Sequence, residues 1–187
     1  MIIYLHGFAS SKNSFKARQM QDFKPTKVLA LDLDVEPIKA LMQIEALIVL
    51  HQNNEPIMLM GSSLGGYYAL CMAKKFDLPA VLINPSMHPY ETLNRFVGFE
   101  QKNYSKKGVV VYKKSYIDQL KSFSFKDVDQ SQILLMLQTG DESLDYKKAL
   151  NALPYARHYI ESGGSHAFDG FEKTFALIEE FYKEMTT

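Results

Sequence analysis

Short runs of mostly apolar residues alternate along the chain with longer segments in which apolar residues recur every three or four positions. The short runs occupy residues 2–5, 27–33, 57–60, 80–83, 132–137 and 157–160. Runs of this length are typical of strands that are buried on both faces. The longer segments occupy residues 14–23, 37–48, 67–76 and 168–185. Their periodicity predicts amphipathic helices that pack on the strands.

Strands that alternate with helices are joined by right-handed crossovers and form a mainly parallel sheet. We therefore expect an α/β fold with a mainly parallel sheet of about six strands flanked by helices. The second helix should begin at Pro37 and turn Ile38, Leu41, Ile44 and Ile48 toward the core. Ligands of such sheets bind at the carboxyl edge of the strands, so the loops that follow the strands are the first place to look for function.

The apolar pattern becomes irregular between residues 86 and 130. This region contains more large apolar residues than a solvated loop needs, among them Phe96, Tyr112 and Phe123. We expect a single domain, residues 1–187, that carries a small cap-like insert at about residues 86–130. An insert that only completes the core is an equally good interpretation. Met87 and His88, at the start of the insert, are candidate residues of a substrate pocket.

Composition narrows the class of protein. The chain has 187 residues, of which 47% are apolar, and it contains 21 basic and 21 acidic side chains. A balanced charge gives no global attraction to nucleic acid or to an anionic membrane. The apolar runs are too short to span a bilayer, and the single cysteine, Cys71, cannot form an internal disulfide. We expect a globular cytoplasmic protein with no membrane span.

The segment Gly61-Ser62-Ser63-Leu64-Gly65 joins a predicted strand to a predicted helix. It fits the pattern Gly-x-Ser-x-Gly, in which small residues let the strand and the helix approach closely while the central serine exposes its hydroxyl on a strained backbone. Ser63 is therefore a candidate nucleophile. Taken alone, the motif also fits a glycine-rich turn that binds a phosphate or no ligand at all.

Two backbone N–H groups are candidates for stabilising an oxyanion. Leu64 follows the candidate nucleophile at the start of the helix, where N–H groups have no partner within the helix. Phe8 follows His6-Gly7 at the end of the first strand, and the loop after that strand supplies the second N–H group in serine hydrolases of this architecture. His6 itself precedes the turn and is interpreted as a structural residue.

An acid and a base follow later in the chain. Asp141 lies just beyond the run at 132–137, where an orienting carboxylate belongs, whereas Asp145 lies at the predicted start of the next helix and suits an N-cap. His166 follows the last strand and two glycines, which free its loop to bring the imidazole over the sheet edge. The order Ser63, Asp141, His166 is that of the α/β-hydrolases.

The chain resembles the YqiA-like esterase family, a compact bacterial group of α/β-hydrolases. The resemblance is carried by five motifs: Tyr4-Leu5-His6-Gly7-Phe8, the serine turn continued through Gly66-Tyr67-Tyr68-Ala69, Asn84-Pro85-Ser86, Gln138-Thr139-Gly140-Asp141-Glu142 and Gly163-Gly164-Ser165-His166-Ala167-Phe168. It implies hydrolysis of carboxylic esters with Ser63, Asp141 and His166 as the catalytic triad.

The sequence thus predicts a serine hydrolase that cleaves small ester substrates through an acyl-Ser63 intermediate, with no metal and no cofactor. Two alternatives stay open. A thioesterase that acts on acyl-CoA or an acyl carrier would use the same triad. A binding module with the hydrolase fold would use none of it, since fold alone does not imply activity. The acyl-chain length and the oligomeric state do not follow from the sequence.

Overall fold

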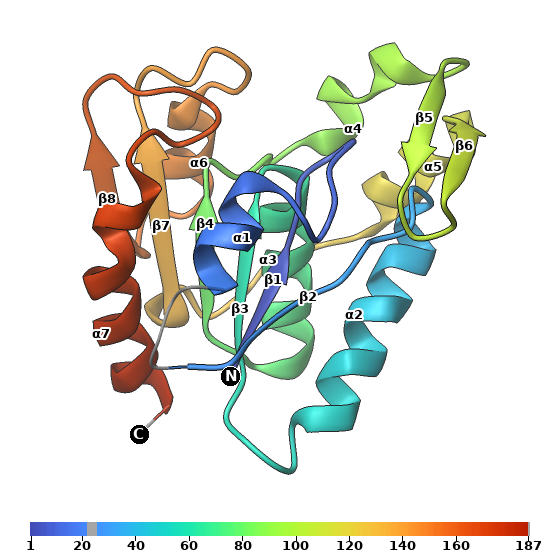
Figure 1. Ribbon diagram of the computed structural model, residues 1–187. Helices are drawn as coiled ribbons and strands as arrows, with labels where there is room; N and C mark the ends of the chain where they lie inside the picture. Colours follow the sequence, from blue (N-terminus) through green and yellow to red (C-terminus); the bar gives the residue numbers. More distant parts are fainter. Residues whose placement is uncertain (22–25, 187) are drawn as a thin grey trace.

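The computed structural model describes residues 1–21 and 26–186. Within these residues a six-stranded sheet runs through the molecule in the order β2-β1-β3-β4-β7-β8, and all five neighbouring pairs are parallel (Figure 1). The strands are β1 (Ile2–Leu5), β2 (Val28–Ala30), β3 (Met58–Ser62), β4 (Ala80–Ile83), β7 (Ile133–Gln138) and β8 (Arg157–Glu161). The predicted α/β fold with a parallel sheet is confirmed.

Helices cover both faces of the sheet. They are α1 (Phe15–Gln21), α2 (Pro37–His51), α3 (Leu64–Phe76), α6 (Tyr146–Ala152) and α7 (Phe175–Thr186), with a 3-10 turn at Phe171–Thr174. Helices α1 and α7 pack on one face, and α2, α3 and α6 pack on the other (Figure 1). Alternate residues of each strand feed the two layers, so Ile3 and Leu5 belong to one core and Ile2 and Tyr4 to the other.

Strand β2 is shorter and less buried than expected. The predicted strand at 27–33 extends only over Val28–Ala30, and all three residues are partly exposed. The reason is position, because β2 is the edge of the sheet and pairs with β1 alone. The helix predicted at 14–23 is α1, which ends at Gln21, and residues 22–23 lie outside the described residues.

Helix α2 begins at Pro37 as predicted, but its buried face differs by one position. Ile44 and Ile48 are buried as expected, whereas Ile38 is 43% exposed and Ala40 is buried in its place. Pro37, Ala40, Ile44 and Ile48 are spaced by three and four residues, so they form one continuous stripe. The prediction for Ile38 was wrong, because Ile38 lies beside this buried stripe and not on it.

The segment between β4 and β7 has secondary structure of its own. It contains α4 (Pro89–Thr92), a 3-10 turn (Asn94–Phe96), β5 (Glu100–Asn103), β6 (Gly108–Val111), α5 (Lys114–Ser122) and a 3-10 turn (Gln130–Gln132). Strands β5 and β6 form an antiparallel hairpin beyond the end of α2 (Figure 1). Helix α5 buries Ile117 and Leu120 in the core, so part of the segment completes the fold. The boundaries of a cap-like insert stay a prediction.

Candidate active site

Ser63 stands in a sharp turn between β3 and α3. Its backbone has φ 55° and ψ −120°, a strained conformation for a residue with a side chain. The turn is tight because a Cβ atom on Gly61 would lie 2.1 Å from the carbonyl oxygen of Gly65, and one on Gly65 would lie 2.1 Å from that of Leu5. Only glycine allows these backbone contacts. The strand, the turn and the helix thus lift Ser63 to the carboxyl edge of the sheet.

Two backbone N–H groups lie beside Ser63. Phe8 and Leu64 line the same hollow as the serine. The loop after β1 passes close to it, since a Cβ atom on Gly7 would lie 3.3 Å from Cβ of Ser63. Within the described part of the chain, neither N–H group donates a hydrogen bond to the protein. Both N–H groups thus stay candidate oxyanion donors.

Asp141 and His166 form an ion pair from the loops after β7 and β8. Asp141 Oδ2 lies 2.8 Å from His166 Nδ1, and the carboxylate side chain is 2% exposed. Asp141 Oδ1 accepts hydrogen bonds of 2.8 Å from the N–H groups of Ser143 and Leu144. Burial by itself raises the pKa of Asp141, but these bonds and the one from His166 outweigh it, so the pKa lies below its usual value.

Asp145, the competing carboxylate, has a structural role. It is the N-cap of α6, and its side chain accepts a hydrogen bond of 3.0 Å from the N–H group of Lys147. This is the role that its position in the sequence predicted. The structure therefore brings Asp141, and not Asp145, to His166.

Ser63 and His166 line two hollows together, one of about 180 Å³ and one of about 210 Å³. No hydrogen bond joins the two side chains among the described residues. In active sites of this kind the bond from nucleophile to base is commonly long before substrate binds and tightens afterwards. Asp141 lies behind the imidazole, so the order along the site is serine, histidine, aspartate.

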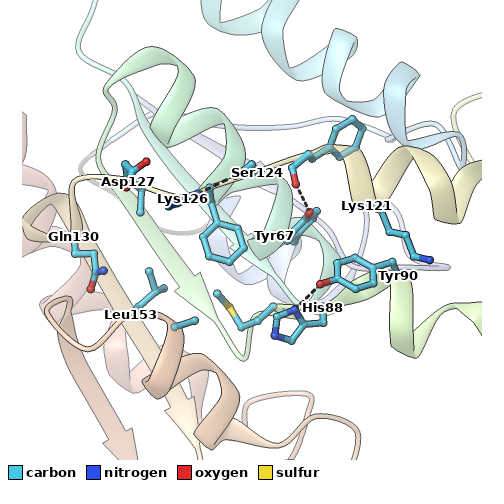
Figure 2. A pocket seen from close by; sticks show the side chains of 14 residues that line it. Tyr67, His88, Tyr90, Lys121, Ser124, Lys126, Asp127, Gln130 and Leu153 are labelled. Carbon is cyan, nitrogen blue, oxygen red and sulfur yellow. Dashed lines mark hydrogen bonds between the residues drawn. The ribbon is translucent and has the colours of Figure 1, made fainter.

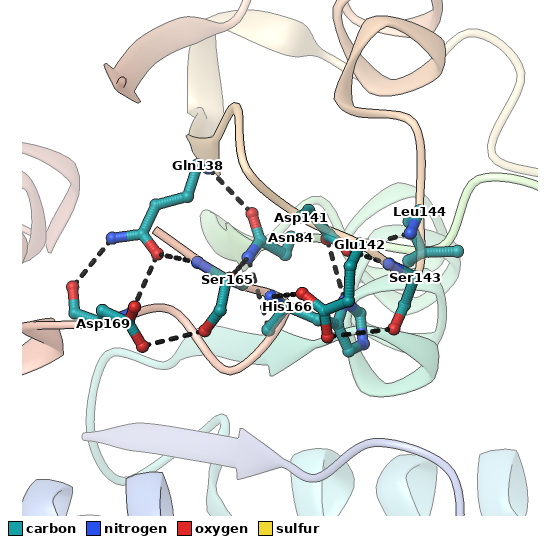
Figure 3. A network of polar contacts seen from close by, with 9 residues as sticks. All are labelled: Asn84, Gln138, Asp141, Glu142, Ser143, Leu144, Ser165, His166 and Asp169. Atoms are coloured by element: carbon teal, nitrogen blue, oxygen red, sulfur yellow. Dashed lines mark hydrogen bonds and ion pairs between the residues drawn. The ribbon is translucent and has the colours of Figure 1, made fainter. Parts of the chain in front are cut away.

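A network of buried amides fixes the loop that carries His166 (Figure 3). Asn84, at the end of β4, donates to the carbonyl oxygens of Ser165 and His166 at 3.0 and 3.3 Å. Its own Oδ1 accepts from the N–H group of Gln138 at 3.0 Å. The side chain of Gln138 in turn accepts from the N–H groups of Ser165 and Asp169 at 3.0 and 2.8 Å. Two strand ends therefore hold the histidine loop.

Sequence reasoning did not assign a role to Asn84 or Gln138. Asn84 is 1% exposed and Gln138 is 2% exposed. A polar amide at the end of an apolar strand is the signal that points to them, since buried polar groups need partners. Gly164 shows the tightness of this contact, because a Cβ atom there would lie 2.1 Å from Oε1 of Gln138.

His6 is a structural residue, in agreement with its interpretation. It is 5% exposed, its Nε2 accepts from the N–H group of Leu33 at 3.0 Å, and its Nδ1 lies 2.8 Å from the carbonyl oxygen of Gly7. Burial lowers the pKa of His6, which favours the neutral ring that these partners require. The ring therefore fixes the loop that leads to Phe8.

Met87 and His88 line neither of the two hollows that contain Ser63. They line a hollow of about 490 Å³ together with Tyr67 and Phe125 (Figure 2), and a second one of about 140 Å³ together with Ser86 and Leu144, which also line a hollow with Ser63. His88 Nδ1 lies 2.9 Å from the hydroxyl of Tyr90. The residues of the same segment that line a hollow with Ser63 are Ser86, Pro89, Thr92, Leu93, Arg95 and Phe96. Met87 is buried and packs into the core. A role for Met87 and His88 in a substrate pocket stays a prediction.

Among residues 1–21 and 26–186, no three side chains of His, Cys, Asp or Glu gather in a way that would hold a metal ion. In the same part of the chain, no helix has both the length and the apolar character needed to cross a bilayer.

Comparisons with known proteins agree with the fold. Residues 1–183 match the family described as "Uncharacterised protein family (UPF0227)". The UPF0227 protein YcfP of Salmonella gallinarum is 27% identical over 188 residues, which covers 97% of this chain and 98% of the relative. Among solved structures, the chain is similar to Est1E from Butyrivibrio proteoclasticus, with ferulic acid bound, at a TM-score of 0.78 and 16% identity.

The Est1E match covers 98% of this chain and 88% of that chain. The esterase Pf2001 from Pyrococcus furiosus is similar at a TM-score of 0.69 and 16% identity, over 100% of this chain and 82% of that chain. At such identities a structural likeness establishes the fold. The chain therefore has the α/β-hydrolase fold and belongs to the UPF0227 family.

Proposed function

We propose that the protein is a serine hydrolase that cleaves carboxylic esters. In this proposal Ser63 is the nucleophile, His166 is the general base, and Asp141 orients the imidazole. One observation carries it: the strained Ser63 and an imidazole held at 2.8 Å by Asp141 line the same two hollows. The chain order of the three residues is the one found in α/β-hydrolases.

The first half of the reaction would acylate the enzyme. With Nδ1–H bonded to Asp141, the free Nε2 of His166 takes the proton of the Ser63 hydroxyl as Oγ attacks the ester carbonyl carbon. The negative oxygen of the tetrahedral intermediate accepts hydrogen bonds from the N–H groups of Phe8 and Leu64. Donors of this kind are worth about 10²–10³ in kcat each. The intermediate collapses, His166 protonates the leaving alkoxide, and the alcohol departs.

The second half would release the acid. A water molecule gives its proton to Nε2 of His166 and attacks the carbonyl carbon of acyl-Ser63. The same two N–H groups stabilise the second oxyanion, and collapse returns the proton from His166 to Ser63 as the carboxylic acid leaves. Every proton transfer uses protein groups and water, so the proposed reaction requires no metal and no cofactor.

The smaller hollow supports a short acyl group. Apolar side chains from three parts of the chain line it, among them Phe8, Leu93, Phe96 and Leu144, beside polar ones such as Arg95. Its volume of about 180 Å³ is small, since pockets for drug-sized ligands measure about 300–1,000 Å³. We infer that α4 and the turn after it act as a small cap that limits the length of the acyl chain.

The proteins of similar fold support the reaction class. Est1E is bound to ferulic acid in its structure, and Pf2001 is titled an esterase. These likenesses support ester hydrolysis as the reaction class, and the residues around Ser63 carry the proposal, since fold alone does not imply function. A cytoplasmic location stays a prediction.

The test compares wild type with Ser63→Ala on p-nitrophenyl acetate and butyrate. We expect turnover by the wild type and a loss of several orders of magnitude in kcat for the variant. Ser122→Ala is a suitable control, because Ser122 is an exposed residue of α5 outside both hollows. Circular dichroism would verify that both variants are folded.

Two further measurements separate the alternatives. Acetyl-CoA and butyryl-CoA, assayed beside oxygen esters of equal chain length, would identify a thioesterase by a higher kcat/KM for the thioesters. A fluorophosphonate probe would label Ser63 in an active serine hydrolase whose substrate is not in the panel. Wild type that neither turns over any ester nor accepts the probe would refute the proposal and favour a binding module.

A further inference from the structure

The second hollow at Ser63 is lined by other parts of the chain than the first. It has a volume of about 210 Å³ and is lined from the loop after β1 and from α1. Ser10, Ser14 and Lys16 contribute polar groups to it, Tyr4, Phe8 and Phe15 contribute aromatic rings, and Ser63 and His166 line it as well. An ester bound at Ser63 extends in two directions from its reacting carbon. Leu64, one of the two proposed oxyanion donors, lines only the first hollow, so we place the acyl part there and the alcohol part in this second hollow.

Lys16 is the only lysine or arginine among the residues that line this second hollow, and no aspartate or glutamate lines it. Lys16 is partly buried. Among the described residues it makes no hydrogen bond and no ion pair. Burial lowers the pKa of Lys16, while the charges of Asp141 and Asp169 partly oppose this effect. The nearby carboxylates are engaged elsewhere, Asp141 with His166 and Asp169 with Ser165.

A partly desolvated ammonium group without an ion-pair partner gains from binding an anion. The hydroxyl of Ser10 can add a hydrogen bond, since it has no protein partner among the described residues. The hydroxyl of Ser14 is already hydrogen-bonded to Tyr4, and its Oγ atom accepts from the N–H group of Ala17 at 3.3 Å. One ammonium and one hydroxyl group can bind the two oxygens of a carboxylate.

We propose that the preferred substrates are esters whose alcohol part carries a carboxylate, and that Lys16 binds this carboxylate in the hollow beside Ser63. The inference rests on the proposed esterase function. Lys16 is then a specificity-determining residue, since its contact lies on the part of the substrate that does not react. Such a contact acts mainly on KM, because it is made equally in the bound substrate and in the transition state.

The test uses two acetate esters of equal size, 4-acetoxybenzoate and 4-acetoxybenzamide, which differ in charge on the alcohol part. We expect the wild type to prefer the benzoate. Lys16→Met keeps the aliphatic stem and should lower kcat/KM for the benzoate by about 10- to 100-fold, through KM, while the benzamide is unaffected. Lys16→Arg keeps the charge and should retain part of the preference.

Lys12→Met is the matched control. Lys12 lies four residues before Lys16, is half-exposed and pairs with Asp32 at 3.8 Å. It should behave as wild type on both esters. The proposal is overturned if the wild type does not prefer the charged ester. It is also overturned if Lys16→Met slows both esters equally, because Lys16 would then only balance the charges of Asp141 and Asp169.

A binding measurement tests the carboxylate site at Lys16 independently of turnover. Calorimetric titration of 4-hydroxybenzoate and 4-hydroxybenzamide into wild type and Lys16→Met reports affinity for the alcohol product alone. We expect tighter binding of the benzoate by the wild type and equal binding of both by the variant; equal binding by the wild type would overturn the proposal. Wild type that binds the benzoate but hydrolyses neither ester would refute the esterase function and leave the carboxylate site standing.

Discussion

Asp141 and Asp145 follow the same strand and carry the same side chain, yet they have different partners. Asp141 accepts from two backbone N–H groups with one oxygen and meets His166 with the other. Asp145 uses its carboxylate for the first turn of α6. The difference comes from position in the loop, because Asp141 reaches the imidazole in the loop after β8, whereas Asp145 already stands at the start of α6.

Asp141→Asn should therefore impair catalysis and Asp145→Asn should not. An amide at 141 can donate to Nδ1 and so favours the wrong tautomer of His166, and the equivalent change in a serine protease lowers kcat about 10⁴-fold. Asparagine caps a helix as well as aspartate does, which makes Asp145→Asn the matched control. The measurement is kcat on p-nitrophenyl acetate. Loss of turnover in Asp145→Asn with normal turnover in Asp141→Asn would reverse the assignment.

The turn between β3 and α3 shows how two elements determine the position of one side chain. Helix α3 starts directly after Ser63 and buries ten consecutive residues, Leu64 to Ala73. The helix crosses the ends of β1 and β3 so closely that backbone atoms touch at Gly61 and Gly65. These contacts, and not the serine itself, require the strained backbone at 63.

Gly61→Ala should destabilise the protein strongly. The added methyl group would meet backbone atoms of Gly65 at 2.1 and 2.3 Å, and backbone cannot move aside as a flexible side chain can. Overpacking of this kind costs about 1–3 kcal/mol and occasionally more. Gly108→Ala is the control, since the nearest atom to its Cβ is at 3.9 Å. Urea unfolding of both variants measures the loss, and equal midpoints would contradict this account of the turn.

At the scale of the whole molecule, the segment between β4 and β7 is joined to the N-terminal loop through aromatic rings. The ring of Phe8 lies 4.9 Å from that of Phe96 and 5.3 Å from that of Tyr112, measured between centroids. Phe8 also supplies one of the proposed oxyanion donors. The segment therefore influences both the shape of the smaller hollow at Ser63 and the loop that completes the site.

Phe96→Ala should widen the smaller hollow at Ser63 and shift the substrate preference of the enzyme toward longer acyl chains. Each additional methylene that becomes buried should raise kcat/KM by about fourfold, which corresponds to about 0.8 kcal/mol. A series of p-nitrophenyl esters from acetate to octanoate measures the shift. Phe99→Ala is the control, because Phe99 belongs to the same segment but is 64% exposed. An unchanged chain-length profile in Phe96→Ala would show that the segment does not bound the acyl group.

Much of the fold follows from local pattern. Apolar runs without helical periodicity identified β1, β3, β4, β7 and β8, and their alternation with helices predicted the parallel sheet. The serine turn was identified because it needs glycine at fixed distances from the serine. Asp141 and His166 were identified because parallel strands bring the loops at their carboxyl ends to one edge. Their catalytic roles stay a proposal.

Tertiary structure alone decided the remaining features. The limited extent of β2 depends on its place at the edge of the sheet, and the buried stripe of α2 depends on which residues meet the core. Met87 and His88 line neither hollow that contains Ser63, while Lys16 lines one of them. Asn84 and Gln138 hold the histidine loop across 27 to 82 residues of sequence.

The sequence by itself determined which residues could do chemistry and which strand each follows, because backbone strain, helix caps and buried strands depend on neighbours within a few positions. It could not determine which polar side chains meet across loops, or which side chains line each hollow. Those contacts join residues that are distant in the chain, and they depend on the relative placement of helices, strands and loops once the core has packed.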